Sequence, residues 1–478
     1  MTVRSSLAVC LAILTGFTGC GIFTAGPAPV QTTSSVLRVN PANPRYFSDG
    51  SGKTIYLAGN DGWPFQDGSG ITLSTQAYLD FLAGRHINLS RFWTWEHTRW
   101  SSFGADQLIN PMPFKRTGPG TALDGQLKFD LNQFDQTYFD RLRSAVIAAR
   151  DRGIYVSVML FQGWSLNVES DGNNPWFGHY FNRNNNINNI DGDVNGDGNG
   201  FEVHTLANSS VTAVQDAYVR KTIETLNDLD NVLWEISNES PDGSKDWQYH
   251  MINLIKAHEA TKPKQHPVGM TATDSDNSIL FASPADWVAL GAATYDSVSD
   301  PYVINPPATD GGKVVILDMD HIGFSIFRDD GNLGMDWAWK SFTRGYNPRD
   351  IAYVPGIIDS TSGNGWDMVT RAVGQTTIYG NKMNMADMTP RTTLCSTAYC
   401  LANPGSEYIV YQPISGESFT VKLMAGTYTY EWFNPSSGTI VSTGAVTSTE
   451  GKRLFSAPFI GDAVLYLKKL AHYTFLDH

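Results

Sequence analysis

The stretch NVLWEISNES, residues 231–240, combines an apolar run with carboxylates. Its Val, Leu, Trp and Ile are typical of a buried strand. Side chains alternate along a strand, so Glu239 shares a face with Glu235, whereas Trp234 and Ile236 point the other way. A buried strand with carboxylates on one face and at its end is typical of a (β/α)8 barrel, whose strands line a lumen and end at the active-site mouth. We expect Glu235 to pair with a nearby Arg in that lumen and Glu239 to face the mouth.

Seven further strand-like runs alternate with helical segments along the first four-fifths of the chain. The strand candidates are residues 53–61, 87–95, 154–164, 266–273, 287–295, 313–320 and 351–358. Amphipathic helical periodicity occurs in residues 74–85, 134–153, 210–229, 245–261, 335–345 and 365–380. Eight strands with intervening helices predict an α/β fold, a (β/α)8 TIM barrel. A doubly wound open sheet is the alternative, but no Gly-rich phosphate loop follows the first strand.

The periodicity changes after about residue 388. Six short alternating strands, separated by Gly, Pro and Ser turns, occupy residues 407–413, 418–424, 427–434, 438–446, 452–458 and 463–469. We therefore expect residues 37–387 to form the barrel and residues 388–478 to form a small antiparallel β-sandwich, an accessory domain.

The N-terminus is typical of an export signal. Residues 1–20 contain one Arg, an apolar run too short for an ordinary transmembrane helix, and small residues before Cys20. This arrangement resembles a bacterial lipoprotein signal, with Cys20 as the lipidated residue and residues 21–36 as a flexible tether. The prediction is an exported protein, either a cell-envelope lipoprotein or a secreted one, that meets a membrane only through this anchor.

The net charge of the chain argues against some partners. It is −13 over 478 residues, and no basic stripe is present to neutralise phosphates, which disfavours nucleic acid. Cys395 and Cys400 are the only other cysteines outside the predicted signal, and they could form a small disulfide or simply lie in a strand or turn.

The predicted seventh strand, KVVILDMD, also ends in acids. Asp318 and Asp320 share one face there, so carboxylates from the fourth and seventh strands would meet across the mouth. Glycoside hydrolysis requires two such groups, because one protonates the leaving oxygen while the other attacks the anomeric carbon or activates water.

The Asn238-Glu239 pair at one strand end and the acids at the other resemble the cellulase-like clan of (β/α)8 retaining glycoside hydrolases. The resemblance implies that Glu239 is the acid/base and that Asn238 contacts the sugar 2-hydroxyl. It also implies that Arg91, in RFWTWEH, lies near the nucleophile and that Tyr295 holds it.

The layout of the chain is similar to apiosidase-like and uncharacterised bacterial barrel proteins. The similarity rests on residues 43–68, 91–97, 396–413 and 430–438, and it covers nearly all of the chain after the tether. In those proteins the C-terminal module carries a collagen-binding label.

One departure from the clan concerns the nucleophile, which is Glu in its members. Here only Asp318 and Asp320 are available, and Asp is one methylene shorter, so retaining and inverting chemistry both stay open. Asp318 is preferred because it aligns with the clan's Glu, Asp320 is the second candidate, and His321 could orient either one.

Further substrate-binding candidates follow or end the predicted strands. The aromatic ones could stack on sugar rings, or pack in the core, and are Trp63, Trp95 and Trp164. The polar ones could bind hydroxyls and are Asp61, Glu96 and His97.

A long insertion after the predicted third strand contains a possible calcium loop. Asp193, Asn195 and Asp197 alternate, and Gly198 is sixth when Asp193 is counted as first. The twelfth residue is His204 rather than Glu, so a turn without metal is the alternative. No other cofactor is expected.

These observations favour a glycosidase that acts on a plant, microbial or host glycan. The rival from another class is a non-catalytic surface protein that binds glycan or matrix on a glycosidase-like barrel, because fold alone does not fix function. Hydrolysis by metal-activated water is disfavoured, since the histidines are scattered along the chain.

Overall fold

The structure is a computed structural model that describes residues 35–68, 74–98, 108–168, 174–271, 277–351 and 365–470. The predicted signal, residues 1–20, and the predicted tether up to residue 34 lie outside the described residues. None of the described helices combines the length and apolar character that crossing a bilayer requires.

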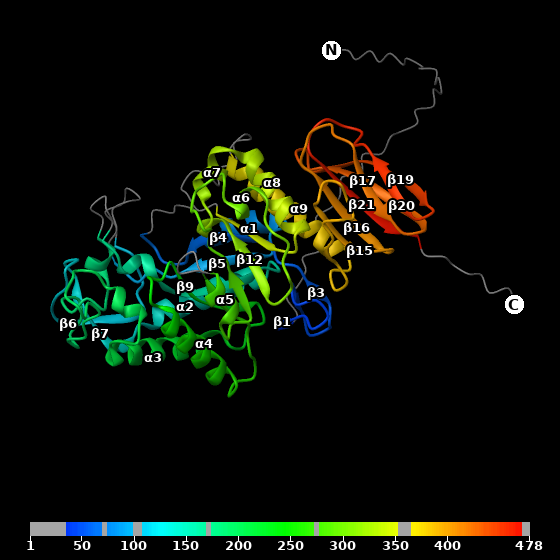
Figure 1. The fold of residues 1–478 in the computed structure, drawn as a ribbon. Coiled ribbons are helices and arrows are strands. Elements are labelled where there is room, and N and C mark those ends of the chain that lie inside the picture. The colour runs from blue at the N-terminus through cyan, green and yellow to red at the C-terminus, as the bar shows by residue number, and fades with distance from the viewer. Residues whose placement is uncertain are drawn as a thin grey trace, which may run out of the picture. The chain divides into compact units, whose positions relative to one another are not determined.

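Eight parallel strands close into a barrel, which confirms the predicted fold (Figure 1). In chain order they are β4 (Gly59–Pro64), β5 (Leu89–Trp93), β8 (Tyr155–Gln162), β9 (Val232–Asn238), β10 (Val268–Thr271), β11 (Trp287–Ala289), β12 (Val314–Asp318) and β13 (Asn347–Ile351). Each predicted strand up to the seventh overlaps one of these. The carboxyl ends of all eight strands therefore meet at one mouth.

Helices surround the barrel, as the amphipathic periodicity predicts (Figure 1). They are α1 (Thr75–Gly84), α2 (Gln136–Arg150), α3 (Ser209–Leu226), α4 (Lys245–Glu259), α5 (Ser278–Ala282), α6 (Pro301–Ile304), α7 (Phe324–Asp329), α8 (Gly331–Thr343) and α9 (Gly365–Lys382). The start of α2 is fixed by Asp135, whose side chain accepts a hydrogen bond from the Thr137 backbone N–H at 2.9 Å. Its buried face repeats every four residues at Tyr138, Leu142 and Val146.

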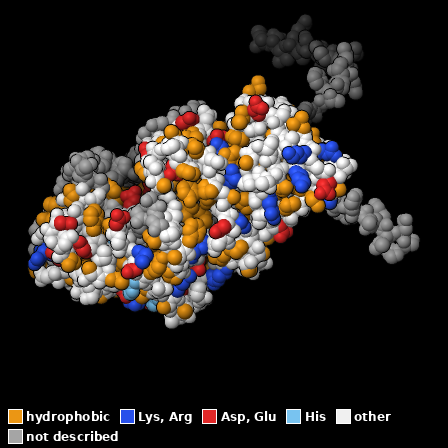
Figure 2. Space-filling view, in the orientation of Figure 1, with side chains coloured by type: hydrophobic (Ala, Val, Ile, Leu, Met, Phe, Trp, Pro, Cys, Tyr) orange, Lys and Arg blue, Asp and Glu red, His pale blue; other side chains and the backbone are white. Residues whose placement is uncertain are grey.

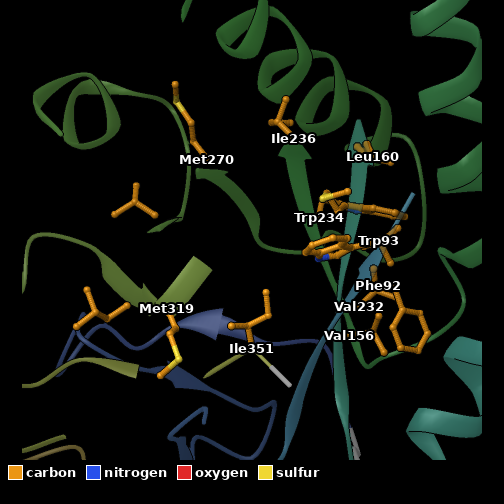
Figure 3. Packing of buried hydrophobic residues seen from close by; sticks show 14 of the residues in the cluster. Phe92, Trp93, Val156, Leu160, Val232, Trp234, Ile236, Met270, Met319 and Ile351 are labelled. Atoms are coloured by element: carbon orange, nitrogen blue, oxygen red, sulfur yellow. The ribbon is translucent and has the colours of Figure 1, made fainter. Parts of the chain in front are cut away.

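The alternation expected in the fourth barrel strand, β9, is observed. Trp234 and Ile236 pack in the large cluster between strands and helices, together with Leu160 of the adjacent β8 (Figure 3). The Trp234 indole N–H donates to Glu259 of α4 at 3.0 Å, whereas Glu235 points into the lumen. One face of the strand therefore packs in the core against the helices, and the other carries the lumen carboxylate.

The eighth barrel strand lies earlier in the chain than the sequence predicts. The prediction was residues 351–358, but β13 is Asn347–Ile351, and residues 352–364 lie outside the described part. The NPRDI segment lacks apolar periodicity because Arg349 and Asp350 have polar partners: Arg349 bonds to Glu235 in the lumen, and Asp350 accepts from Asn60 and Thr370. Apolar patterning therefore could not reveal it.

The amino-terminal end of the barrel is filled by apolar residues. Leu89, Leu233 and Ile316 from three strands form one buried cluster there. A small antiparallel sheet contributes to the same cluster and consists of β1 (Arg38–Val39), β2 (Phe47–Ser48) and β3 (Thr54–Ile55). The charged side chains are consequently confined to the middle and the mouth of the lumen.

Short elements elaborate the loops near the mouth. They are the hairpin β6 (Phe114–Thr121) and β7 (Leu127–Phe134) and the single turns η1 (Gly163–Leu166), η2 (Pro175–Gly178), η3 (Phe201–His204) and η4 (Met319–His321). Two of these turns directly follow strands: η1 follows β8 and η4 follows β12.

The C-terminal region forms two antiparallel sheets over one apolar cluster, as expected for a sandwich. The strands are β14 (Thr389–Pro390), β15 (Cys400–Asn403), β16 (Glu407–Gln412), β17 (Phe419–Leu423), β18 (Gly426–Asn434), β19 (Thr439–Ser448), β20 (Gly451–Phe455) and β21 (Ala463–Lys469). Strands β17 and β20 pair, and the other six form the second sheet. Cys395 and Cys400 are buried here as free thiols, so the structure contains no bridge between them.

Candidate active site

Two buried arginines hold the lumen carboxylates together. Arg91 donates to Asp61 at 3.0 Å and to Glu235 at 2.6 Å, and Arg349 donates to Glu235 at 3.2 Å and to Asp318. Burial by itself would raise the pKa of Glu235, but the two guanidinium groups outweigh it and lower the value to about 2. Glu235 therefore pairs with arginines in the lumen, as the sequence predicts. The sequence does not predict Arg349 in the lumen, because the predicted eighth strand begins only at residue 351 whereas β13 is Asn347–Ile351.

Asp318 is part of this buried layer. It is 0% exposed, and its Oδ1 accepts the Asp320 backbone N–H at 3.1 Å. Its Oδ2 accepts from Arg349 and lies 3.1 Å from His321 Nδ1. Burial opposes ionisation, but Arg349 and His321 overcome that effect and hold the pKa of Asp318 well below its usual range. Asp318 is consequently an ionised, fully engaged carboxylate.

Asp320 occupies a different environment. Its Oδ2 accepts no hydrogen bond from any described residue and lies 3.7 Å from Arg91 Nη1 and 3.8 Å from His321 Nε2. Burial and the charge of Glu239 raise the pKa of Asp320 to about 7. Among the described residues, Asp320 therefore has an oxygen without a hydrogen-bond donor, but that oxygen is buried and the residue is only 6% exposed.

Glu239 and Tyr295 face the same part of the mouth. Partial burial and the charges of Asp320 and Glu239 raise the pKa of Tyr295. Glu239 and Tyr295 are both exposed, Tyr295 by 53%. The structure thus brings Glu239, Asp320 and Tyr295 within electrostatic reach of one another.

The backbone at Glu239 departs from regular strand geometry. Its φ is +43°, a left-handed conformation that costs energy for a residue other than glycine. The preceding Asn238 is 2% exposed, and its Oδ1 accepts from Arg91 at 3.0 Å and from His321 at 2.8 Å. The turn at Glu239 breaks strict alternation: Asn238 is buried against Arg91 and His321 in the lumen, while the adjacent Glu239 is exposed at the mouth.

The other substrate-binding candidates fall into different environments. Trp164 is partly buried in η1 and packs against Trp95 and His97, with ring centroids 6.1 and 5.6 Å away. Trp95 is 2% exposed and belongs to the core. The side chain of Trp63 lies outside the described part of the structure.

Glu96 and His97 do not bind substrate hydroxyls as expected, because both side chains are 0% exposed. They point beneath the mouth instead: Glu96 accepts from Tyr180 at 2.6 Å, and His97 bonds to Ser165 at 2.7 Å. Burial would raise the pKa of Glu96, but His179 and His204 beside it outweigh burial and hold the value well below its usual range.

The loop with Asp193, Asn195 and Asp197 is stabilised by its own hydrogen bonds. Asp193 Oδ1 accepts from the Gly196 N–H at 2.7 Å, and Asn195 Nδ2 donates to Asp197 at 3.1 Å and to Glu202 Oε1 at 2.6 Å. No three His, Cys, Asp or Glu side chains gather as metal ligands among the described residues.

The contact between Asn195 and Glu202 indicates a different register for the calcium loop. If Asp191 is counted as first, Asp193 is third, Asn195 fifth, Gly196 sixth and Glu202 twelfth. This spacing matches the complete calcium-loop pattern, including the Glu that was missing when the count began at Asp193. The sequence alone therefore contains the complete pattern, beginning two residues before Asp193.

Comparisons with known proteins extend the description of the fold. The family described as "Domain of unknown function (DUF6298)" matches residues 97–288, and no curated protein matches the chain. A solved structure described as a glycoside hydrolase is 14% identical, with a TM-score of 0.59, over 91% of this chain and 97% of the other. A family 5 glycoside hydrolase from Bacteroides vulgatus ATCC 8482 is 13% identical, with a TM-score of 0.58, over 91% and 94%.

Structural neighbours of this chain are therefore glycoside hydrolases, including a member of family 5. At these identities the similarity is one of fold. The finer resemblance to apiosidase-like proteins and the collagen-binding label of the C-terminal module stay predictions.

Proposed function

We propose that the protein is a glycoside hydrolase that cleaves O-glycosidic bonds of a poly- or oligosaccharide with two carboxylates. The observation that supports this most is that Glu239 and Asp320 lie close enough at the barrel mouth to interact electrostatically with each other and with Tyr295. Two carboxyl groups with different environments, at the carboxyl ends of barrel strands, are what this chemistry needs. The glycoside hydrolase neighbours support the same reaction class.

Within the pair, Glu239 is the proposed acid/base, and Asp320 is the better candidate for the second carboxylate. Asp318, which the sequence favoured, has hydrogen bonds on both oxygens and is fully buried. A nucleophile needs an oxygen that is not already held by hydrogen bonds, and Asp320 Oδ2, although buried, has no donor among the described residues. Asp318 would then hold Arg349 and His321 in place.

The protonation of the pair fits a shared-proton mechanism. Because burial and the charge of Glu239 raise the pKa of Asp320 to about 7, the pair retains one proton up to about neutral pH. That proton is transferred to the leaving glycosidic oxygen, and the ionised partner attacks the anomeric carbon or deprotonates the attacking water. The raised pKa places this proton on Asp320 while Glu239 is charged. The proposed roles therefore require the proton to move to Glu239, to which the resemblance assigns the acid/base role, before the glycosidic bond breaks.

The proposed setting is outside the cytoplasm. The predicted signal would export the chain, and Cys20 would anchor it by lipid or the protein would be secreted. The substrate is a carbohydrate rather than nucleic acid. On the face in Figure 2, acidic side chains are scattered over the barrel, and no continuous basic stripe crosses the described residues. Residues 388–478 would serve as an accessory domain.

A screen of the wild-type protein against plant, microbial and host glycans tests the proposal. Product chromatography should show released sugars with at least one glycan, and NMR of the first product formed should report retention or inversion. Binding to a glycan without any cleavage would instead support the non-catalytic surface protein and overturn the hydrolase.

A further inference from the structure

A buried network behind the mouth centres on Glu96. Its Oε2 accepts the Gln162 backbone N–H at 2.7 Å, and its Oε1 accepts the Tyr180 hydroxyl at 2.6 Å. His179 Nε2 and His204 Nε2 lie 3.7 and 3.8 Å from the same carboxylate. Since Glu96 is 0% exposed, these groups, and not substrate, are its environment.

One branch of this network reaches the amide of Asn238. Gln162 Oε1 accepts from Asn238 Nδ2 at 3.1 Å. The next residue, Gly163, lies directly against the backbone of Glu239, because a Cβ at Gly163 would be 2.0 Å from the Glu239 carbonyl oxygen. The segment that Glu96 fixes through the Gln162 N–H therefore supports both Asn238 and Glu239.

The second branch reaches the residue after Glu239. His204 Nδ1 shares a hydrogen bond of 2.9 Å with the Ser240 hydroxyl, which lies 2.5 Å from the Ser237 hydroxyl. The His204 ring is stacked on Trp247, with centroids 4.2 Å apart and planes 9° apart. His204 is thus held between Glu96 and the chain that carries Glu239.

We propose that Glu96 is a positioning residue that fixes the Asn238-Glu239-Ser240 segment from both sides; this rests on the function proposed above. A carboxylate suits the place because both of its oxygens accept, whereas an amide has one acceptor and would turn its NH2 toward a donor. With Glu96→Gln the network loosens, and Glu239 is displaced from the position at which it delivers its proton.

The experiment compares Glu96→Gln with Glu259→Gln, a matched buried control. Glu259 is 1% exposed and accepts from Asn227 and Trp234 at 3.0 Å and from the His266 N–H at 2.6 Å. These partners lie on the helix-facing side of β9, at the end of α3 and before β10, and none of them belongs to the Asn238-Glu239-Ser240 segment. Each variant is assayed on the glycan that the wild type cleaves and on the 4-nitrophenyl glycoside of the sugar released.

A displaced acid slows departure of a poor leaving group and hardly affects nitrophenolate. Glu96→Gln should lower the ratio of kcat/KM for glycan to that for the aryl glycoside by about 10-fold or more, since misplacement by about 1 Å costs on the order of 10²-fold. Glu259→Gln should keep the wild-type ratio even if it lowers Tm. Ser240→Ala, a milder break in the second branch, should shift the ratio in the same direction by a few-fold.

If Glu96→Gln folds and keeps the wild-type ratio of kcat/KM for glycan to that for the aryl glycoside, the positioning role is wrong while the proposed function stands. If Glu96→Gln does not fold, an unchanged ratio in Ser240→Ala leads to the same conclusion. If the wild type cleaves no glycoside, the proposed function fails and the positioning role fails with it. The two failures are distinguished by the wild-type assay.

Discussion

Gly163 offers the sharpest test of how the mouth is built, because its backbone lies against that of Glu239. A methyl group there would lie 2.0 Å from the Glu239 carbonyl oxygen and 2.7 Å from the Ser240 Cα. Ordinary van der Waals contact begins near 3.4 Å, so Gly163→Ala must separate the two segments by about 1.4 Å. Both contacts are backbone atoms, which cannot rotate away as a side chain can.

A displacement of about 1 Å at a reacting group costs on the order of 10²-fold in rate. Gly163→Ala should therefore lower kcat/KM on the cleaved glycan by about 10²-fold and lower Tm through the strain. The control is Gly84→Ala in α1, where a Cβ would meet nothing within 4 Å and helix propensity favours Ala. Initial rates and thermal melts of both variants are the assay. Wild-type activity in folded Gly163→Ala would refute the inferred packing of η1 against Glu239.

Two further predictions concern stability. Asp320→Asn should stabilise the protein above pH 7 and change its stability little near pH 4. Because the pKa of Asp320 is raised in the folded protein, the free energy of unfolding falls as pH rises from 3.8 to about 7, by up to about 4 kcal/mol. Asn does not ionise and so avoids this loss. Urea melts at the two pH values check this, and equal effects at both would contradict it. Calcium should raise Tm and EDTA should lower it. Glu202→Ala and Asp191→Ala should remove this response, whereas the control Asp246→Ala, at an exposed carboxylate outside the loop, should still show it. A wild-type Tm that does not respond to calcium would show that the loop is not a metal site.

Much of the barrel was predictable because its strands and helices have different apolar periods. Trp234 and Ile236 pack toward the helices and Glu235 faces the lumen, as strand alternation requires. The eighth strand was misplaced because Arg349 and Asp350 satisfy their polarity inside the fold. Local pattern cannot show a partner that is distant in sequence.

The candidate site was predictable only as far as residue type and strand position allow. Glu239 and Asp320 were both found as strand-end acids, but the choice of Asp318 over Asp320 depended on which oxygens are already bonded. A Glu at the end of a strand has the same sequence pattern whether it is exposed or buried, so the sequence predicts Glu96 as a substrate ligand although the structure buries it. Its role depends on Tyr180 and His204, which come from the later insertion.

The most direct test of the central claim is kcat/KM of Glu239→Gln on the glycan that the wild type cleaves. Gln has nearly the same shape as Glu but cannot donate the proton, and general acid catalysis contributes on the order of 10²–10⁴-fold. We predict a loss in that range on the glycan and a smaller loss on the corresponding 4-nitrophenyl glycoside. Full activity of Glu239→Gln on the natural glycan would contradict the two-carboxylate mechanism proposed for this protein.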